Sequence, residues 1–213
     1  MLIKELIAEG VLKTPEIITA FQKIDRRDFV RAGDTEVASA NRPLPIGYGQ
    51  TISQPYTVAF MLELLQAKEG DRILDIGSGS GWQMALLANL VGEKGKVFAL
   101  ELIPELFELG KKNVAKYGFI KTGQVEYYCQ NAINGLAEKA PFDKIIAAAS
   151  GKSVPEAWKK QLKIGGRLVL PVGNSLRLVI KKSETDFAES VYPGFVFVPL
   201  VDASPSAKFG EKI

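Results

Sequence analysis

Short apolar segments alternate with amphipathic segments between residues 71 and 173. The apolar segments contain few polar interruptions, which is typical of strands covered on both faces. The predicted strands are RILDIG (72–77), KVFALE (96–101), QVEYYC (124–129), DKIIAAA (143–149) and GRLVLPVG (166–173). The predicted helices between them span 81–91, 104–118 and 154–162. This alternation indicates βαβ units around a mostly parallel sheet.

The two ends of the chain depart from this pattern. After Gly173, the strand-like segments 175–183 and 191–201 follow each other without a helix, which predicts antiparallel strands at the sheet edge. Before residue 70, the apolar spacing predicts helices over 2–12, 14–24 and 55–67. We therefore expect a helical cover at the N-terminus and extra strands at the C-terminus.

The segment PLPIGYGQTISQP, from Pro43 to Pro55, has three prolines, two glycines and no charged residue. Proline lacks a backbone donor and glycine weakens a strand, so we expect a rigid, irregular loop rather than a helix or strand. A polar loop without any charge is unusual for a protein surface, where lysine and glutamate are common.

The sharpest local motif is ILDIGSGSGWQ (73–83), in which Asp75 ends a strand and three glycines form the turn into a helix. A dinucleotide site would carry G-x-G-x-x-G. Counted from Gly77 or Gly79, the sixth position is Trp82 or Met84, so a nicotinamide dehydrogenase is disfavoured. The pattern suits a nucleoside ligand without a pyrophosphate. Glu101 ends the next strand and can accept hydrogen bonds from ribose hydroxyls.

Composition limits the remaining chemistry. The chain of 213 residues has no histidine and one cysteine, Cys129, which excludes imidazole bases, internal disulfides and zinc sites rich in His or Cys. We expect no metal. The net charge of +3 does not indicate a nucleic-acid surface. Without a signal peptide or an apolar run of ~18 residues, we expect a cytoplasmic protein with no membrane partner.

The glycine turn and the acidic residue at the end of the next strand, Glu101, together resemble the cofactor-binding arrangement of the Rossmann-like class I S-adenosylmethionine-dependent methyltransferases. RPLPIGYGQTISQPYTVAFMLELL (42–65) is similar, almost residue for residue, to protein-L-isoaspartate O-methyltransferases. The similarity continues in LDIGSGSGWQ, APFDKIIAAAS (140–150), QLKIGGRLVLPVG (161–173) and FVPLV (197–201), and covers about residues 26 to 201. It implies an α/β methyltransferase fold with a mostly parallel sheet, antiparallel edge strands and an N-terminal helical cover.

The resemblance implies one methyltransferase domain over residues 1–213. Its parts are a helical cover with the substrate loop (1–70), a cofactor-binding core (71–173), and edge strands with a tail (174–213). The implied activity is protein repair. A methyl group passes from S-adenosylmethionine to the α-carboxylate of L-isoaspartyl residues in damaged proteins and peptides, and S-adenosylhomocysteine is released. We expect a monomer without a nucleic-acid partner.

The resemblance also assigns site residues. Ser53 is the implied catalytic residue. The implied substrate-binding residues are Ile52, Ser53, Gln54, Val198 and Pro199. The implied cofactor-binding residues are Gln50, Thr51, Ile52, Asp75, Gly77, Ser78, Gly79, Ser80, Gly81, Glu101, Leu102, Asn131 and Ala132. A carboxylate nucleophile is already deprotonated at neutral pH, so this reaction needs no general base, in agreement with the missing histidine.

One segment departs from the family pattern. Gln130-Asn131-Ala132 stands where the family usually carries Gly-Asp-Gly. The Asn131 amide oxygen can still accept a hydrogen bond from the adenine amino group, so we expect weaker cofactor binding with an intact fold. Two alternatives stay open at this point. One is another methyltransferase on this scaffold, acting on a small molecule, a modified peptide or RNA, and the other is a catalytically impaired interaction protein.

Overall fold

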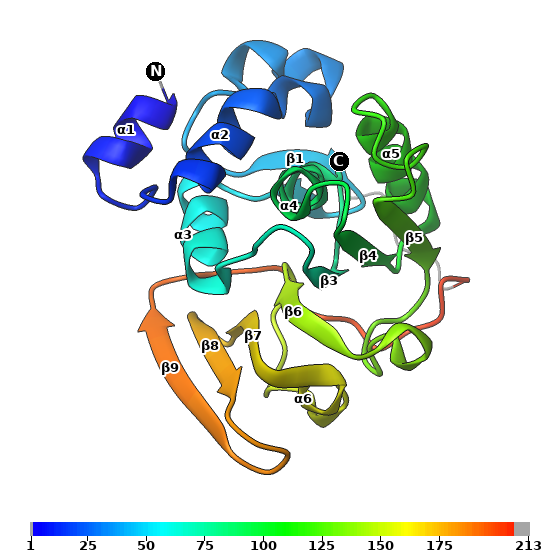
Figure 1. The fold of residues 1–213 in the computed structure, drawn as a ribbon. Coiled ribbons are helices and arrows are strands. Elements are labelled where there is room, and N and C mark those ends of the chain that lie inside the picture. The colour runs from blue at the N-terminus through cyan, green and yellow to red at the C-terminus, as the bar shows by residue number, and fades with distance from the viewer. Residues whose placement is uncertain (1, 207–213) are drawn as a thin grey trace.

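The computed structural model describes residues 2–206 of the chain. Its centre is a seven-stranded sheet in the order β5-β4-β3-β6-β7-β8-β9 (Figure 1). The strands are β3 (Arg72–Ile76), β4 (Lys96–Glu101), β5 (Val125–Cys129), β6 (Phe142–Ala147), β7 (Leu162–Val172), β8 (Ser175–Lys181) and β9 (Phe187–Pro193). Strands β3 to β7 pair in parallel, and β8 and β9 pair antiparallel at the edge. The predicted α/β fold with antiparallel edge strands is confirmed.

Helices cover both faces of this sheet (Figure 1). The α-helices are α1 (Leu2–Ala8), α2 (Pro15–Lys23), α3 (Pro55–Leu65), α4 (Trp82–Val91), α5 (Pro104–Ala115) and α6 (Glu156–Gln161). The 3-10 helices are η1 (Arg26–Phe29), η2 (Ala32–Val37) and η3 (Ala137–Lys139). In β3, Ile73 packs into the apolar cluster under α1 to α5, and Leu74 into the cluster around Trp158 of α6. Because neighbouring residues enter opposite clusters, these strands need apolar residues at nearly every position.

The predicted irregular loop over 43–55 is wrong. Strands β1 (Leu44–Gly47) and β2 (Gln50–Ile52) form a small antiparallel hairpin. Its two turn residues, Tyr48 and Gly49, have φ of 54° and 70°, as a two-residue type I′ turn requires. Pro45 is tolerated because a two-stranded ribbon consists only of edges.

The prediction for the end of the chain is partly wrong. A strand was expected over 191–201, but β9 ends at Pro193. The following residues leave the sheet and cross its carboxyl edge, where Ser150 N–H donates to Val198 O (2.7 Å) and Leu200 N–H donates to Ser150 O (2.8 Å). The end of the expected tail, residues 207–213, lies outside the described residues.

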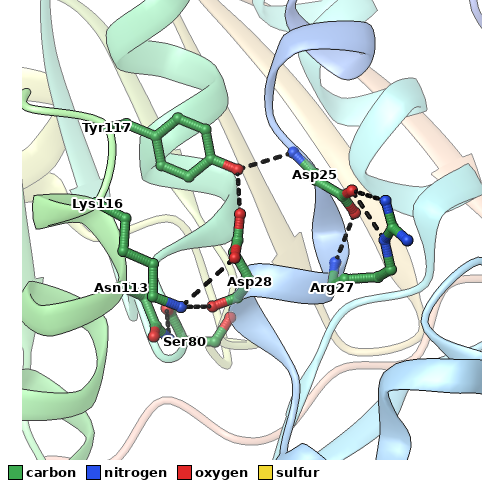
Figure 2. Close-up of polar contacts among 7 residues, drawn as sticks. All are labelled: Asp25, Arg27, Asp28, Ser80, Asn113, Lys116 and Tyr117. Carbon is green, nitrogen blue, oxygen red and sulfur yellow. Dashed lines mark hydrogen bonds and ion pairs between the residues drawn. The ribbon is translucent and has the colours of Figure 1, made fainter.

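A polar network attaches η1 to α5 (Figure 2). The Tyr117 hydroxyl donates to Asp28 Oδ2 (2.7 Å) and accepts from Asp25 N–H (3.0 Å). Burial and the Asp28 hydrogen bond raise the pKa of Tyr117, so it stays a neutral donor. Asn113 Nδ2 donates to Ser80 O (3.0 Å), which joins the same helix to the glycine turn. The glycine turn is therefore held by α5, and the N-terminal cover by Tyr117, which lies directly after this helix.

A buried guanidinium holds the irregular chain that precedes α3. Arg26 is 5% exposed, and its Nη1 and Nη2 atoms donate to four backbone carbonyls: Ala38 (2.7 Å), Ala40 (3.3 Å), Arg42 (2.9 Å) and Ser53 (3.1 Å). Burial lowers the pKa of Arg26 to about 10, which leaves it cationic at neutral pH. Its carbon Cζ lies 5.3 Å from the centroid of the Trp82 ring. These contacts connect the N-terminal cover to the chain around Ser53.

A carboxylate is enclosed at the end of β3. Asp75 is fully buried and accepts a hydrogen bond from Gln83 Nε2 on its Oδ1 atom (2.8 Å). Its Oδ2 atom has no partner within residues 2–206. Burial raises the pKa of Asp75 from its usual value of 3.8 to about 7, and the negative charge of Glu101 adds to the shift. The folded protein therefore holds a proton on Asp75 at pH values where the unfolded chain has lost it.

We expect Arg26→Lys to lower the free energy of unfolding by roughly 2 kcal/mol, because one ammonium group cannot reach carbonyls that a planar guanidinium spans. Urea unfolding measures the change. Arg27→Lys is the matched control, since Arg27 is exposed and pairs with Asp25 at the surface. Equal effects of the two substitutions would contradict the role given to the buried side chain.

We expect Asp75 to make the protein less stable as the pH rises from about 4 to about 7, by roughly 1.4 kcal/mol per pH unit. In this window the unfolded chain has already released the proton that folded Asp75 retains, so folding must take up a proton, and this uptake costs more free energy as the pH rises. Asp75→Asn keeps the Gln83 contact and cannot ionise. Its gain in unfolding free energy over the native protein should therefore be larger at about pH 8 than at about pH 5. Equal gains at both pH values would contradict the buried proton.

Candidate functional site

A cavity opens at the carboxyl edge of the parallel strands, between the loops that follow β3, β4 and β6. From β3 the chain passes to β4 and β5 on one side, and β6 then joins β3 on its other side. In open α/β sheets, ligands bind at this reversal of strand order. The empty space in the cavity and its open mouth together is about 950 Å³.

The glycine turn after β3 forms one wall of the cavity. Gly77, Gly79 and Gly81 have φ of 75°, 51° and 88°, a region that side chains disfavour. Gly77 and Gly79 line the cavity, but Gly81 does not. A Cβ atom on Gly81 would lie 2.9 Å from Gly110 O of α5 and 2.8 Å from Val114 Cγ2. The absence of a side chain at Gly81 therefore allows α4 and α5 to pack closely, and Gly81 does not line the cavity.

Glu101, the last residue of β4, closes the base of the turn. Its Oε2 atom accepts from Gly79 N–H (2.8 Å), and its Oε1 atom accepts from Leu102 N–H (2.8 Å) and Ile103 N–H (3.0 Å). Burial raises the pKa of Glu101, while these three hydrogen bonds oppose the shift. A carboxylate offers about four acceptor positions, so one position on Oε2 remains for a ligand hydroxyl.

A groove adjoins the cavity on the side of the β1–β2 hairpin. Four residues line both spaces: Thr51, Ser53, Ala148 and Val198. Aromatic side chains form part of the wall of the groove. Phe60 lies at ring-centroid distances of 5.0 Å from Phe195 and 5.3 Å from Tyr192. An elongated, partly apolar ligand in the groove could therefore reach into the cavity at Ser53.

The structure places most of the predicted site residues around these two spaces. Those that line the cavity are Gln50, Thr51, Ile52, Ser53, Gly77, Ser78, Gly79, Ser80, Glu101, Leu102, Ala132, Val198 and Pro199. Gln54 lines the groove, where its Nε2 atom donates to Asn41 O (2.9 Å). Asp75 lies beneath the turn, outside the cavity lining. It can support the turn but does not face the cavity.

Asn131 also lies outside the cavity lining, although its neighbours Gln130 and Ala132 belong to it. The Asn131 amide oxygen, which was expected to face adenine, accepts from Ile133 N–H (2.8 Å). Its Nδ2 atom donates to Asp202 Oδ1 (2.7 Å) and Ala203 O (2.9 Å). In this structure the side chain is directed to the C-terminal segment.

Sequence reasoning missed several lining residues. Ala148 and Ala149 follow β6, beside the reversal of strand order, so the rule for open sheets could have identified them. Leu200 and Val201 were expected to form an edge strand and instead line the cavity. The aromatic groove joins residues of α3 to residues that follow β9, and no spacing in the sequence indicates that contact.

The described part of the chain offers neither a metal centre nor a membrane span. Residues 2–206 contain no cluster of three Cys, Asp or Glu side chains that could hold a metal ion. None of the helices within the same residues is long and apolar enough to cross a membrane.

Comparison with known proteins gives one consistent family. The family model of protein-L-isoaspartate(D-aspartate) O-methyltransferases (PCMT) matches residues 1–205. A protein-L-isoaspartate O-methyltransferase of Ignicoccus hospitalis is 40% identical over 206 residues, which cover 94% of this chain and 96% of the relative. One from Thermococcus onnurineus is 41% identical over 204 residues, with coverage of 93% and 91%.

A solved structure gives the same fold. A Plasmodium falciparum protein, called a beta-aspartate methyltransferase (PCMT) and crystallised with S-adenosyl-L-homocysteine, superposes with a TM-score of 0.84. The alignment covers 94% of this chain and 96% of that one at 23% identity, which supports the fold alone. On the family model and the relatives, this chain belongs to the protein-L-isoaspartate(D-aspartate) O-methyltransferase family.

Proposed function

We propose that the cavity binds S-adenosylmethionine and that the groove holds an L-isoaspartyl segment of a damaged protein, whose α-carboxylate is methylated beside Ser53. The family to which the chain belongs supports this reaction. The single observation that carries the assignment of roles is that the cavity and the groove share four lining residues, one of which is Ser53. A methyl donor and a peptide in separate spaces can react only where those spaces join.

The residues around the cavity fit S-adenosylmethionine. When bound, this cofactor supplies an electrophilic methyl group on a sulfonium and leaves as S-adenosylhomocysteine. Gly77 and Gly79 present backbone rather than side chains to the ligand, and the free acceptor position of Glu101 Oε2 suits a ribose hydroxyl. If Glu101 accepts both ribose hydroxyls, one of its backbone N–H bonds must be exchanged for the second hydroxyl.

The substrate side of the site needs to orient an anion without neutralising it. The carboxylate is already deprotonated at neutral pH, so the protein has to position one oxygen and remove water around it. Ser53 offers a neutral hydroxyl donor at the junction of the two spaces. The nearby cation Arg26 donates to backbone carbonyls, including Ser53 O, instead of facing the cavity. A salt bridge to the carboxylate would stabilise the ground state and slow the reaction.

The groove supports a peptide substrate over the alternatives. In an isoaspartyl residue the main chain runs through the side-chain carboxyl, so the α-carboxylate is a short branch that can enter the cavity while the chain stays in the groove. Aromatic walls pack well against flanking side chains of varied sequence. A nucleic-acid substrate would require a basic surface, and the relatives do not favour an RNA methyltransferase or an inactive interaction protein.

The proposed activity is tested with labelled S-adenosylmethionine and two peptides that differ only in aspartate or isoaspartate at one position. We expect label on the isoaspartyl peptide alone. Label on the aspartyl peptide at an equal rate would contradict the proposed substrate. Label on neither peptide would contradict the proposed activity.

We expect Ser53→Ala to lower kcat/KM for the isoaspartyl peptide by roughly 10- to 100-fold, because a hydrogen bond to a charged group is lost. The dissociation constant for S-adenosylhomocysteine, measured by calorimetry, should change by less than about twofold, since the cofactor keeps the glycine turn and Glu101. Ser190→Ala, an exposed serine of β9, is the matched control. Equal losses of turnover and cofactor affinity would contradict a substrate role for Ser53.

A further inference from the structure

A segment near the end of the described chain crosses the cavity and is bonded to residues on both sides of it. We define the C-terminal strap as residues 198–203, which follow the aromatic wall of the groove (Figure 1, orange to red). At its start, Ser150 N–H donates to Val198 O and Leu200 N–H donates to Ser150 O. At its end, Asn131 Nδ2 donates to Asp202 Oδ1 and Ala203 O. Between these anchors, Val198 to Val201 line the cavity.

The positions of the two anchors explain why the strap covers the cavity. Ser150 follows β6, and Asn131 follows β5. In the sheet, β4 and β3 lie between β5 and β6, and these inner strands carry Glu101 and the glycine turn. A segment attached beside β6 and beside β5 must therefore span the carboxyl ends of both inner strands.

The contacts of Asn131 require an amide. Its oxygen accepts from Ile133 N–H, and its nitrogen faces a carboxylate and a carbonyl, both of which can only accept. An aspartate could keep the Ile133 contact, but its second oxygen would then face Asp202 and Ala203 O without a proton to share. Two carboxylates at 2.7 Å repel each other.

We propose that Asn131 is a positioning residue that holds the C-terminal strap over the cofactor cavity, and that Asp202 is its partner. The sequence predicted a contact with adenine, whereas in the structure Asn131 bonds to Ile133 N–H and to the strap and lies outside the cavity lining. The inference rests on the proposed function in so far as the cavity binds S-adenosylmethionine. It implies that an aspartate at position 131, which the family usually carries, would weaken cofactor binding in this chain.

The test combines four variants with two measurements. Calorimetric titration gives the dissociation constant for S-adenosylhomocysteine, and amide hydrogen exchange of residues 198–203 in the cofactor-free protein reports how often the strap opens. Asn131→Asp should raise both the dissociation constant and the exchange rate by about tenfold or more. The double variant Asn131→Asp with Asp202→Asn should recover part of both changes, because the amide now at position 202 can donate to the carboxylate now at position 131, whereas the bond to Ala203 O is not rebuilt.

Two controls complete the design. Asp202→Asn alone should behave like the native protein, since the Asn131 amide nitrogen can donate to the amide oxygen introduced at position 202. Asn134→Asp places the same charge on an exposed residue of the same loop and should change neither measurement. An increase of the same size in Asn134→Asp would overturn the proposal, because charge alone would then explain the effect.

The direct adenine contact gives the opposite outcome. In that case Asn131→Asp would bind S-adenosylhomocysteine as tightly as the native protein or more tightly, and the double variant would have the same dissociation constant and exchange rate as Asn131→Asp alone. Either result overturns the strap assignment. If the native protein did not bind S-adenosylhomocysteine, the proposed function would fail. The exchange measurement without cofactor would still decide whether Asn131 holds the strap.

Discussion

A single buried cation determines how the N-terminal part of the chain meets the rest of the protein. The Arg26 guanidinium donates to the carbonyls of Ala38, Ala40, Arg42 and Ser53, which lie outside the helices and strands. Buried carbonyls need donors, and a planar group with five N–H bonds can serve several at once. Because one of the four carbonyls is that of Ser53, the contact that orders the cover also positions the junction of cavity and groove.

The site itself is built from backbone groups and buried carboxylates rather than from catalytic acids and bases. Glu101 is compensated by three backbone N–H groups, whereas Asp75 beneath the turn is bonded on one oxygen only within the described chain. Glu101 can therefore face a ligand as an acceptor, while Asp75 supports the turn from inside the core. A reaction whose nucleophile is already an anion needs orientation more than proton transfer, and a site without histidine is sufficient for that.

The β1–β2 hairpin and the C-terminal strap, which are far apart in sequence, lie at the same edge of the sheet. The β1–β2 hairpin, which follows the N-terminal cover in sequence, and the C-terminal strap both line the cavity. Val198 contributes to both the cavity and the groove, so the strap forms part of the surface where the methyl donor and the peptide are proposed to meet. Asn131, which differs from the usual family residue, bonds to this strap in the structure.

Local sequence patterns are sufficient to predict the parallel sheet, its antiparallel edge and the glycine turn followed by Glu101. These features depend on local patterns: apolar strands buried on both faces, helices between them, and glycines where φ is positive. Other features of the site depend on packing between segments that are far apart in the chain. The β1–β2 hairpin, the aromatic groove and the Asn131–Asp202 contact join residues that are distant in sequence or that local propensity assigns to loops. A side chain such as Asn131 can bond to any acceptor within its reach, so the local sequence does not specify its partner. The partner is set only when packing against the folded sheet brings the two segments together.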